Sequence, residues 1–195
     1  MYITKKQLSR VVDSCRQPLN EQRMFSVEHP DASVFLSHKH DEKTLLLRVK
    51  TFFENLGMSV YVDWLDTKMQ HPTDKQTAED LKKQIDENDK FIFIATDGSM
   101  DSPWCSWEIG VGDALKLKDD KIAIFPIAEN DGSWTNHEYL QIYPHIEYEN
   151  GNSRYTNGNL IPKGYYVEYP AKNRGSSLKP LKDWLCEGMP KTRFL

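Results

Sequence analysis

The amino-acid sequence predicts an α/β fold with a central parallel sheet of about five strands and helices on both faces. Strand-like runs alternate with helical patterns between residues 32 and 127, which is typical of parallel sheets. The runs 90–95 and 121–127 are almost continuously apolar, as expected for central strands that are covered on both sides. A chain of 195 residues with 38% hydrophobic and 28% charged residues is long and apolar enough to bury a core. We therefore expect one domain with short additions at its ends.

Composition excludes several classes of protein. The formal net charge of −4 provides no broad attraction to phosphate backbones or anionic lipids, so neither nucleic acid nor a membrane is an expected partner. The three cysteines are widely separated and lack CxxC spacing, which argues against a disulfide framework and a structural zinc site. The N-terminus is polar, and no run of about 18 apolar residues follows. These features are typical of a cytoplasmic protein.

The first 31 residues are predicted to form a helix and a linker. Thr4 and Gln7 have capping-box spacing, and apolar residues recur on one face of a helix over 4–17. Two prolines and many polar residues follow in 17–30, which indicates a linker.

The main domain is expected to span residues 32–170, and its elements follow from the change of hydrophobic period along the chain. In order, the pattern predicts a strand at 32–37, a helix at 45–56 capped by Gly57, a strand at 58–62, a polar loop at 63–73, a helix at 75–88, a strand at 90–95, a loop at 96–103, a helix at 104–117 and a strand at 121–127. Beyond Ala128 we expect a short helix or edge strand at 139–146, a loop at 150–158 and a last strand at 165–169. Residues 171–195 are predicted to be a tail with a short helix at 178–186.

Chemistry-bearing side chains follow the predicted strands at their carboxyl ends. In an open parallel sheet this edge forms the binding crevice. The candidates there are Ser37, His38 and Lys39 after the first strand, Asp63 and Trp64 after the second, and Trp104 and Glu108 on the helix that follows the third. Because Trp104 and Glu108 are four residues apart, they lie on one helical face.

Three sequence boxes resemble the Toll/interleukin receptor (TIR) family. Residues 101–108, Asp-Ser-Pro-Trp-Cys-Ser-Trp-Glu, are similar to the family's S-x-W-C-x-x-E box and also satisfy the W-x-x-x-E pattern of its bacterial members. Residues 34–41 look like the first box, and 60–63 look like the strand before the mobile BB loop. The resemblance covers residues 32–127 in order and spacing, and extends more loosely to residue 170.

The resemblance implies a flavodoxin-like fold and a domain that either recruits other TIR domains or consumes NAD⁺ as a substrate, with no cofactor or metal. Glu108 corresponds to the glutamate of the family's enzymes. Loss of nicotinamide leaves an oxocarbenium-like ribose, and a buried carboxylate can stabilise its positive charge and bind ribose hydroxyls. The sequence therefore predicts Glu108 as the catalytic carboxylate.

The neighbouring candidates are expected to bind substrate. Trp104 is predicted to stack on a base or ribose, so that a hydroxyl or adenine attacks the intermediate and a cyclic product forms. Ser37, His38 and Lys39 are expected to contact phosphates or the nicotinamide ribose. The loop that begins with Asp63 and Trp64 is expected to close over substrate or to dock on a neighbouring subunit, although it lacks the glycine common in the family.

Plainer interpretations stand beside these. Glu108 alone fits a solvated residue in a first helical turn. Metal ligation is one interpretation of His38, His40 and Asp41, but no second cluster completes a site, so a solvated turn is the favoured interpretation. Cys105 is better interpreted as a small buried hydrophobe. A packing role is open for both Trp104 and Trp107, and it is the preferred interpretation for Trp107. In the predicted helix at 104–117, Gly110 and Gly112 are expected to permit close helix packing.

Three functions remain open at this point. The first is an NAD⁺ glycohydrolase or ADP-ribosyl cyclase that makes a cyclic ADP-ribose-type signal for a downstream effector, in a bacterial antiphage pathway such as Thoeris. The second is a non-catalytic adaptor that acts by self-assembly with other TIR domains. The third is a nucleoside deoxyribosyltransferase, which would need deoxynucleosides and an acceptor base.

Overall fold

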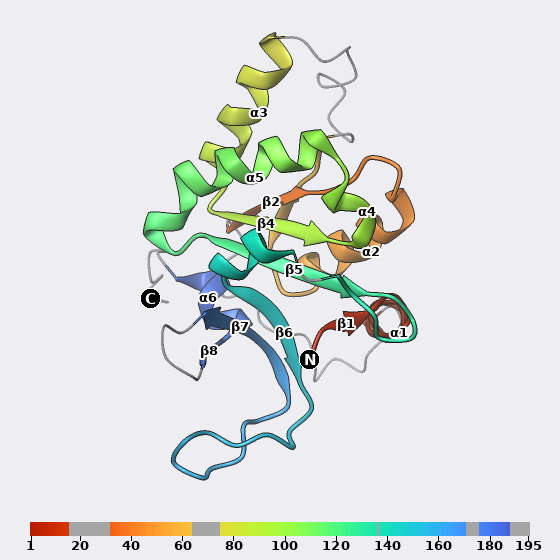
Figure 1. The fold of residues 1–195 in the computed structure, drawn as a ribbon, viewed down its shortest axis with the longest axis vertical. Coiled ribbons are helices and arrows are strands. Elements are labelled where there is room, and N and C mark those ends of the chain that lie inside the picture. Colours follow the sequence, from red (N-terminus) through yellow and green to blue (C-terminus); the bar gives the residue numbers. More distant parts are fainter. Residues whose placement is uncertain (16–31, 64–74, 136, 171–175, 188–195) are drawn as a thin grey trace, which may run out of the picture.

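An eight-stranded sheet organises the part of the chain that the computed structural model describes, which comprises residues 1–15, 32–63, 75–135, 137–170 and 176–187 (Figure 1). Its strands are β1 (Ile3–Thr4), β2 (Ser33–Ser37), β3 (Ser59–Tyr61), β4 (Lys90–Ala95), β5 (Ile122–Ala128), β6 (His145–Glu149), β7 (Gly164–Pro170) and β8 (Ser176–Pro180). They lie in the order β3-β2-β4-β5-β6-β7-β8, and β1 pairs with the end of β5.

The first five strands of that order are all parallel, whereas β7 and β8 are antiparallel additions. Counted from β2 along the chain, the parallel strands have the spatial order 2-1-3-4-5 of a flavodoxin-like sheet. The predicted parallel sheet of about five strands is therefore confirmed, and the antiparallel β8 and the short β1 are additions that the sequence did not indicate.

Helices cover both faces of this sheet (Figure 1). The α-helices are α1 (Lys5–Cys15), α2 (Lys43–Glu54), α3 (Lys75–Glu87), α4 (Asp97–Met100), α5 (Pro103–Lys116) and α6 (Leu181–Cys186), and two short 3-10 helices are η4 (Leu117–Asp119) and η5 (Glu138–Ile142). Helices α1, α2 and α6 contribute to one core cluster, and α3, α5 and η5 contribute to the other. Within the described residues no helix is both long and apolar enough to cross a bilayer.

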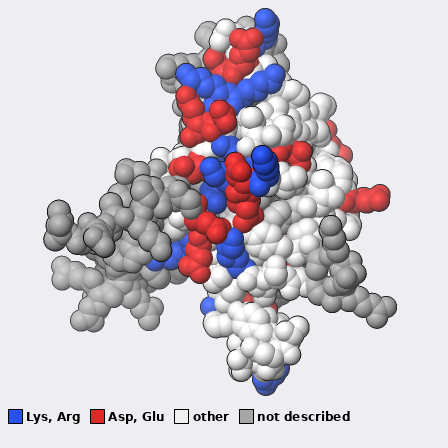
Figure 2. Space-filling model, turned by 90° about the vertical axis from the view of Figure 1, so that its left-hand side faces the viewer, with Lys and Arg blue, Asp and Glu red and all other residues white. Residues whose placement is uncertain are grey.

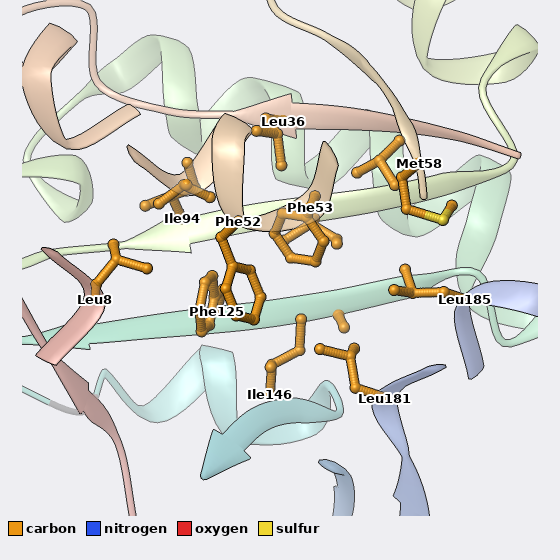
Figure 3. Packing of buried hydrophobic residues seen from close by; sticks show 14 of the residues in the cluster. Leu8, Leu36, Phe52, Phe53, Met58, Ile94, Phe125, Ile146, Leu181 and Leu185 are labelled. Atoms are coloured by element: carbon orange, nitrogen blue, oxygen red, sulfur yellow. The ribbon is translucent and has the colours of Figure 1, made fainter. Parts of the chain in front are cut away.

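Alternate residues of the central strands belong to the two different core clusters. In β4, Ile92 and Ile94 belong to the first cluster, whereas Phe91 and Phe93 belong to the second. Successive strand residues point to opposite faces, so a strand in which every residue is buried feeds two cores at once. Figure 3 shows the first cluster, in which Phe52 and Phe53 of α2 lie against Phe125 of β5 and α6 closes the far side.

Local sequence signals set several element boundaries. The predicted capping box at α1 is confirmed, since the Thr4 N–H donates to Gln7 Oε1 at 2.9 Å and the Gln7 N–H donates to Thr4 Oγ1 at 3.2 Å. Gly57 ends the α2 region with φ +88, a conformation that glycine adopts without strain, and donates its N–H to the Glu54 carbonyl. At the start of α5, Ser102 caps the helix and Pro103 occupies its first turn.

Three boundaries differ from the sequence-based expectation. Residues 178–180 belong to β8 rather than to the predicted 178–186 helix, which begins only at Leu181 because residues 178–180 pair with β7. The segment 139–146 holds most of η5 and the start of β6, and β6 lies between β5 and β7 instead of at an edge. The predicted 96–103 loop contains the short helix α4, where Thr96 and Ser99 form a capping box.

The glycine pair in α5 has two different environments. A Cβ atom added at Gly112 would lie 2.9 Å from a ring carbon of Phe91, so the expected close packing is confirmed there. At Gly110 nothing lies within 4 Å of such an atom, so the same expectation is wrong for Gly110.

Candidate active site

The candidate site lies at the carboxyl edge of the sheet, between the ends of β2 and β4. These strands are neighbours in the sheet although α2, β3 and α3 separate them in the chain. The connections from their carboxyl ends run to opposite faces of the sheet, to α2 and to α5. In doubly wound folds this switch point leaves a crevice that receives ligands.

Glu108 is buried at this point. It lies in the second turn of α5, its residue is 1% exposed, and its Oε2 accepts a hydrogen bond of 2.5 Å from Ser37 Oγ at the end of β2. Burial, and next the negative charge of Asp63, raise the pKa of Glu108 to about 8, while the Ser37 bond and His40 act in the opposite direction. The carboxyl group is therefore held against a strand end instead of lying in bulk solvent, and it resists ionisation.

Asp63 follows β3 and contacts two histidines of the β2–α2 turn. His40 Nε2 lies 3.1 Å from Asp63 Oδ2, and His38 Nδ1 lies 3.6 Å from Asp63 Oδ1. Asp63 is 5% exposed. Its hydrogen bond raises the pKa of His40, whereas burial lowers the pKa of His38. The pKa values of the two rings therefore move in opposite directions, so the site favours protonation of His40 more than protonation of His38.

Among the described residues, one buried ring nitrogen of His38 has no hydrogen-bond partner. Its Nδ1 lies 3.3 Å from the Leu36 carbonyl oxygen, which can only accept, so this contact places the ring proton on Nδ1. Nε2 is then an acceptor, buried and unpartnered. An unsatisfied buried polar atom is costly, and a ligand that donates a hydrogen bond would remove that cost.

The rim of the site carries more polar groups. Lys39 is partly exposed, and its Nζ lies 3.1 Å from Asp41 Oδ2. Across the edge, Thr96 Oγ1 donates to Glu42 Oε2 at 2.7 Å, which ties the end of β4 to the turn before α2. Lys39 therefore forms an ion pair with Asp41 at the rim of the site.

Two tryptophans that precede Glu108 in α5 stack on each other. The rings of Trp104 and Trp107 lie 4.9 Å apart with an interplanar angle of 18°, and both pack against the second core cluster. Cys105, between them, is completely buried, and burial raises the pKa of its thiol to about 11. This environment fits the expected small hydrophobe, because a thiol with that pKa is protonated at neutral pH.

The structure brings four of the predicted site residues together: Ser37, His38, Asp63 and Glu108. Lys39 lies at the rim and faces Asp41, Trp104 packs on Trp107, and Trp64 falls outside the described residues. Sequence reasoning placed His40 in a solvated turn and missed its contact with Asp63. The available signal was the repeated histidine after a strand, which does not by itself show where either ring points.

No group of three or more His, Cys, Asp and Glu side chains suited to a metal ion occurs in the described ranges. The ionisable groups at the site act on one another directly.

Comparisons with known proteins agree with this architecture. Residues 34–157 match the family model described as the TIR domain. Over 117 residues the chain is 34% identical to a Bacillus cereus (strain MSX-D12) protein named "Probable 3' cyclic ADP-D-ribose synthase ThsB'", covering 58% of this chain and 59% of that protein. Over 79 residues it is 29% identical to a Cytobacillus dafuensis protein provisionally named cyclic ADP-D-ribose synthase TIR2, covering 39% of this chain and 21% of that one. The chain thus spans less than two thirds of the length of either relative, whereas the family model covers more than half of the chain, and we conclude that the chain belongs to the TIR domain family.

Proposed function

We propose that this protein cleaves the bond between nicotinamide and ribose in NAD⁺ and produces a cyclic ADP-ribose-type signal. The observation that carries the proposal is the buried carboxyl of Glu108 at the switch point of the sheet, where Ser37 orients it. The names of the two relatives support the same reaction class.

Each group has a role that its position supports. The electron pair of the C1′–N bond leaves with nicotinamide, which becomes neutral, and the ribose becomes an oxocarbenium-like cation. Ionised Glu108 stabilises this cation, while Ser37 holds the carboxylate in place. The cationic nicotinamide ring of bound NAD⁺ favours ionisation of Glu108, because an opposite charge nearby lowers a carboxyl pKa.

The remaining groups act on binding and on the nucleophile. His38 Nε2 offers an acceptor to a ribose hydroxyl or to the nicotinamide carboxamide. Lys39 at the rim attracts the pyrophosphate, and Asp63 and Trp64 are further candidates for substrate binding. Trp104 directs attack on the cation by a ring nitrogen or hydroxyl of the same molecule, which loses its proton and closes the cyclic product; attack by water gives linear ADP-ribose instead.

The wider setting is part of the same proposal. The protein acts in the cytoplasm of a bacterium, self-assembles with other TIR domains, and reaches a downstream effector through its nucleotide product in antiphage defence. NAD⁺ is its substrate, and neither a metal nor a cofactor takes part.

The test is to incubate purified protein with NAD⁺ at low and high protein concentration and identify the products by chromatography and mass spectrometry. We expect equal amounts of nicotinamide and ADP-ribose-derived product, with a cyclic isomer among them. If cell extract and high concentration also leave NAD⁺ intact while the protein assembles with TIR domains, the adaptor function replaces this one. Exchange of bases between deoxynucleosides would instead support a deoxyribosyltransferase.

A further inference from the structure

An apolar groove lies between α3 and α5, on the face of the sheet that carries the second core cluster. It has a volume of about 860 Å³ and is open to solvent. Trp107 and Val111 line the groove from α5 and pack against that cluster, whereas Lys82 and Asp86 line it from α3. None of these residues takes part in the proposed cleavage of NAD⁺, so the groove is a surface that this reaction does not explain.

The groove is also lined by Gly110, a glycine that packing among the described residues does not require. Glycine in the interior of a helix is destabilising relative to alanine, and it is useful where another group approaches the backbone closely. At Gly112 that group is the ring of Phe91, whereas a Cβ atom added at Gly110 would meet nothing within 4 Å. The open space at Gly110 therefore favours close approach by another molecule.

A stacked nucleotide fits this groove poorly. The ring of Trp107 already stacks on Trp104, with 4.9 Å between the ring centres. Lys82 Nζ also lies over the Trp107 ring, 5.8 Å from its centroid. Both contacts compete with a base for the indole ring, and the carboxylate of Asp86 opposes the phosphates of a nucleotide. These features favour a protein surface as the occupant.

The two ends of the groove carry opposite charges. Lys82 lies at the Trp107 end, as its contact with that ring shows. Asp86 lies at the other end, because its carbonyl oxygen accepts a hydrogen bond of 2.8 Å from Lys116 Nζ near the end of α5. Helices α3 and α5 therefore lie side by side in the same direction, with a positive charge at one end of the groove and a negative charge at the other.

The two ends also differ in shape. Leu115 lines the groove next to Lys116, at the Asp86 end, and is 39% exposed although it is apolar. Gly110 leaves open space nearer to the Trp107 end. A protruding leucine and a negative charge thus lie at one end, and a hollow and a positive charge lie at the other. Such a surface is complementary to a copy of itself that is related by a two-fold axis.

We propose that the groove between α3 and α5 is a two-fold interface between two copies of this chain. Leu115 of each copy packs over Gly110 of the other, and Lys82 of each copy faces Asp86 of the other. The inference rests on the self-assembly part of the proposed function, for which it names the surface, and it does not require NAD⁺ cleavage. A second copy is favoured over an unrelated partner because both the shapes and the charges occur in the order that a two-fold axis needs.

The experiment measures the dissociation constant of the dimer by sedimentation velocity over a range of protein concentrations, without NAD⁺. Wild type is expected to show a monomer–dimer equilibrium. Gly110→Leu fills the hollow and Leu115→Glu places a charge on the apolar contact, so each is expected to raise the dissociation constant about tenfold or more. Leu47→Glu changes an exposed leucine of α2, on the opposite face of the sheet, and is the matched control that leaves the dissociation constant unchanged.

Exchange of charges tests the relative orientation of the two copies. Lys82→Glu opposes two carboxylates across the axis, and Asp86→Lys opposes two lysines, so each is expected to raise the dissociation constant several-fold. The variant with both substitutions has opposite charges across the axis again, and its dissociation constant is expected to return toward the wild-type value. A double variant that associates no better than either single variant would overturn the proposed arrangement.

Stability of the monomer separates loss of the interface from damage to the fold. Gly110→Leu is expected to unfold in urea at the same or a higher midpoint than wild type, because its position is open and leucine favours a helix. Weaker association in a variant that is at least as stable supports the interface. Association that is unaffected by both Gly110→Leu and Leu115→Glu would overturn it.

Other outcomes also decide between occupants and between proposals. Wild type that stays monomeric at every concentration overturns this inference, and so does saturable binding of NAD⁺ to the monomer that Gly110→Leu abolishes, because the groove would then hold a nucleotide. Nicotinamide release is measured separately. An inactive protein that still dimerises through the groove supports the interface and not the cleavage, whereas an active monomer supports the cleavage and not the interface.

Discussion

Glu108 reduces the stability of the fold at the pH where its carboxylate is needed. Its pKa rises from 4.5 to about 8 on folding, mainly because the group is buried. The native protein therefore keeps a proton that the unfolded chain has already lost, and stability falls as pH increases from 4.5 to about 8. At about 1.36 kcal/mol per pKa unit, the full effect is on the order of 5 kcal/mol.

Glu108→Gln keeps the shape of the side chain and removes this penalty. We expect the variant to be more stable than wild type by several kcal/mol above about pH 8. The gain is expected to shrink as pH falls toward 4.5, because the penalty for losing the proton in the native state disappears there. Urea denaturation at a series of pH values measures the difference. Glu54→Gln, at a surface pair with Lys50, is the control and is expected to change stability by less than about 1 kcal/mol. A gain for Glu108→Gln that does not vary with pH would contradict the buried, protonated state.

Trp104 tests how the product is selected. If its ring holds the intermediate for internal attack, Trp104→Ala releases more linear ADP-ribose relative to cyclic product, while Trp104→Phe keeps a ring and stays closer to wild type. Chromatography of the products over one time course gives the ratio. The same ratio in wild type and Trp104→Ala would remove Trp104 from this role.

The site residues differ in how far the sequence could reveal them. Ser37 and Glu108 belong to boxes at a strand end and in a helix, and the order of elements alone brings those positions to one edge. The pairing of His40 with Asp63 depends on the shape of the five-residue turn between β2 and α2, for which hydrophobic periodicity carries no information. The long-range pair could therefore be found only in three dimensions.

Helix α5 carries Glu108, the candidate catalytic residue. The close packing of this helix on the sheet depends on Gly112. The Phe91 ring beneath this glycine is completely buried and stacks on Phe35 at 5.6 Å, and these contacts restrict its movement. A methyl group at position 112 therefore forces the helix and the sheet apart.

Gly112→Ala is expected to destabilise the protein by about 1 to 3 kcal/mol, which a urea titration detects. Gly110→Ala is the matched control, because an added methyl group there meets nothing within 4 Å and alanine favours the helix by up to about 1 kcal/mol. Equal effects of the two substitutions would show that the contact with Phe91 does not position the helix.

The sequence predicts the elements that have a regular apolar period or a continuous apolar run. It does not predict those that depend on pairing with a neighbouring strand or on a capping box. β4 and β5 are entirely buried and read as apolar runs, and α2 and α3 carry regular apolar faces. β8 has the sequence Ser-Ser-Leu-Lys-Pro, which carries no strand pattern and is held by its pairing with β7. α4 has four residues and depends on the Thr96–Ser99 capping box rather than on periodicity.

At the scale of the whole molecule, the described segments near both ends of the chain pack on the TIR sheet. Ile3 and Leu8 near the start and Trp184 near the end are all buried in the first core cluster. The C-terminal strand is also fastened by polar groups, because Lys179 Nζ and the Tyr169 hydroxyl both donate to Asp120 Oδ2, at 3.0 and 2.7 Å. The described terminal segments thus share one core with the site-bearing sheet, although no sequence box predicts them.

Charged side chains of both signs are mixed on one face of the molecule (Figure 2). On the face shown in Figure 2, Lys and Arg side chains are interspersed with Asp and Glu side chains, so the described residues form no continuous basic patch there. A mixed surface gives little net attraction to a phosphate backbone. Attraction for the pyrophosphate of NAD⁺ would instead be local, at Lys39.

The central claim is that the buried carboxyl of Glu108 performs the cleavage, and the most direct test is the rate of nicotinamide release from NAD⁺ by Glu108→Gln. At a pH above about 8, where the wild-type carboxyl is ionised, we expect the rate to fall by about a hundredfold or more, with Glu54→Gln unchanged. Folded Glu108→Gln that releases nicotinamide at the wild-type rate would contradict the account.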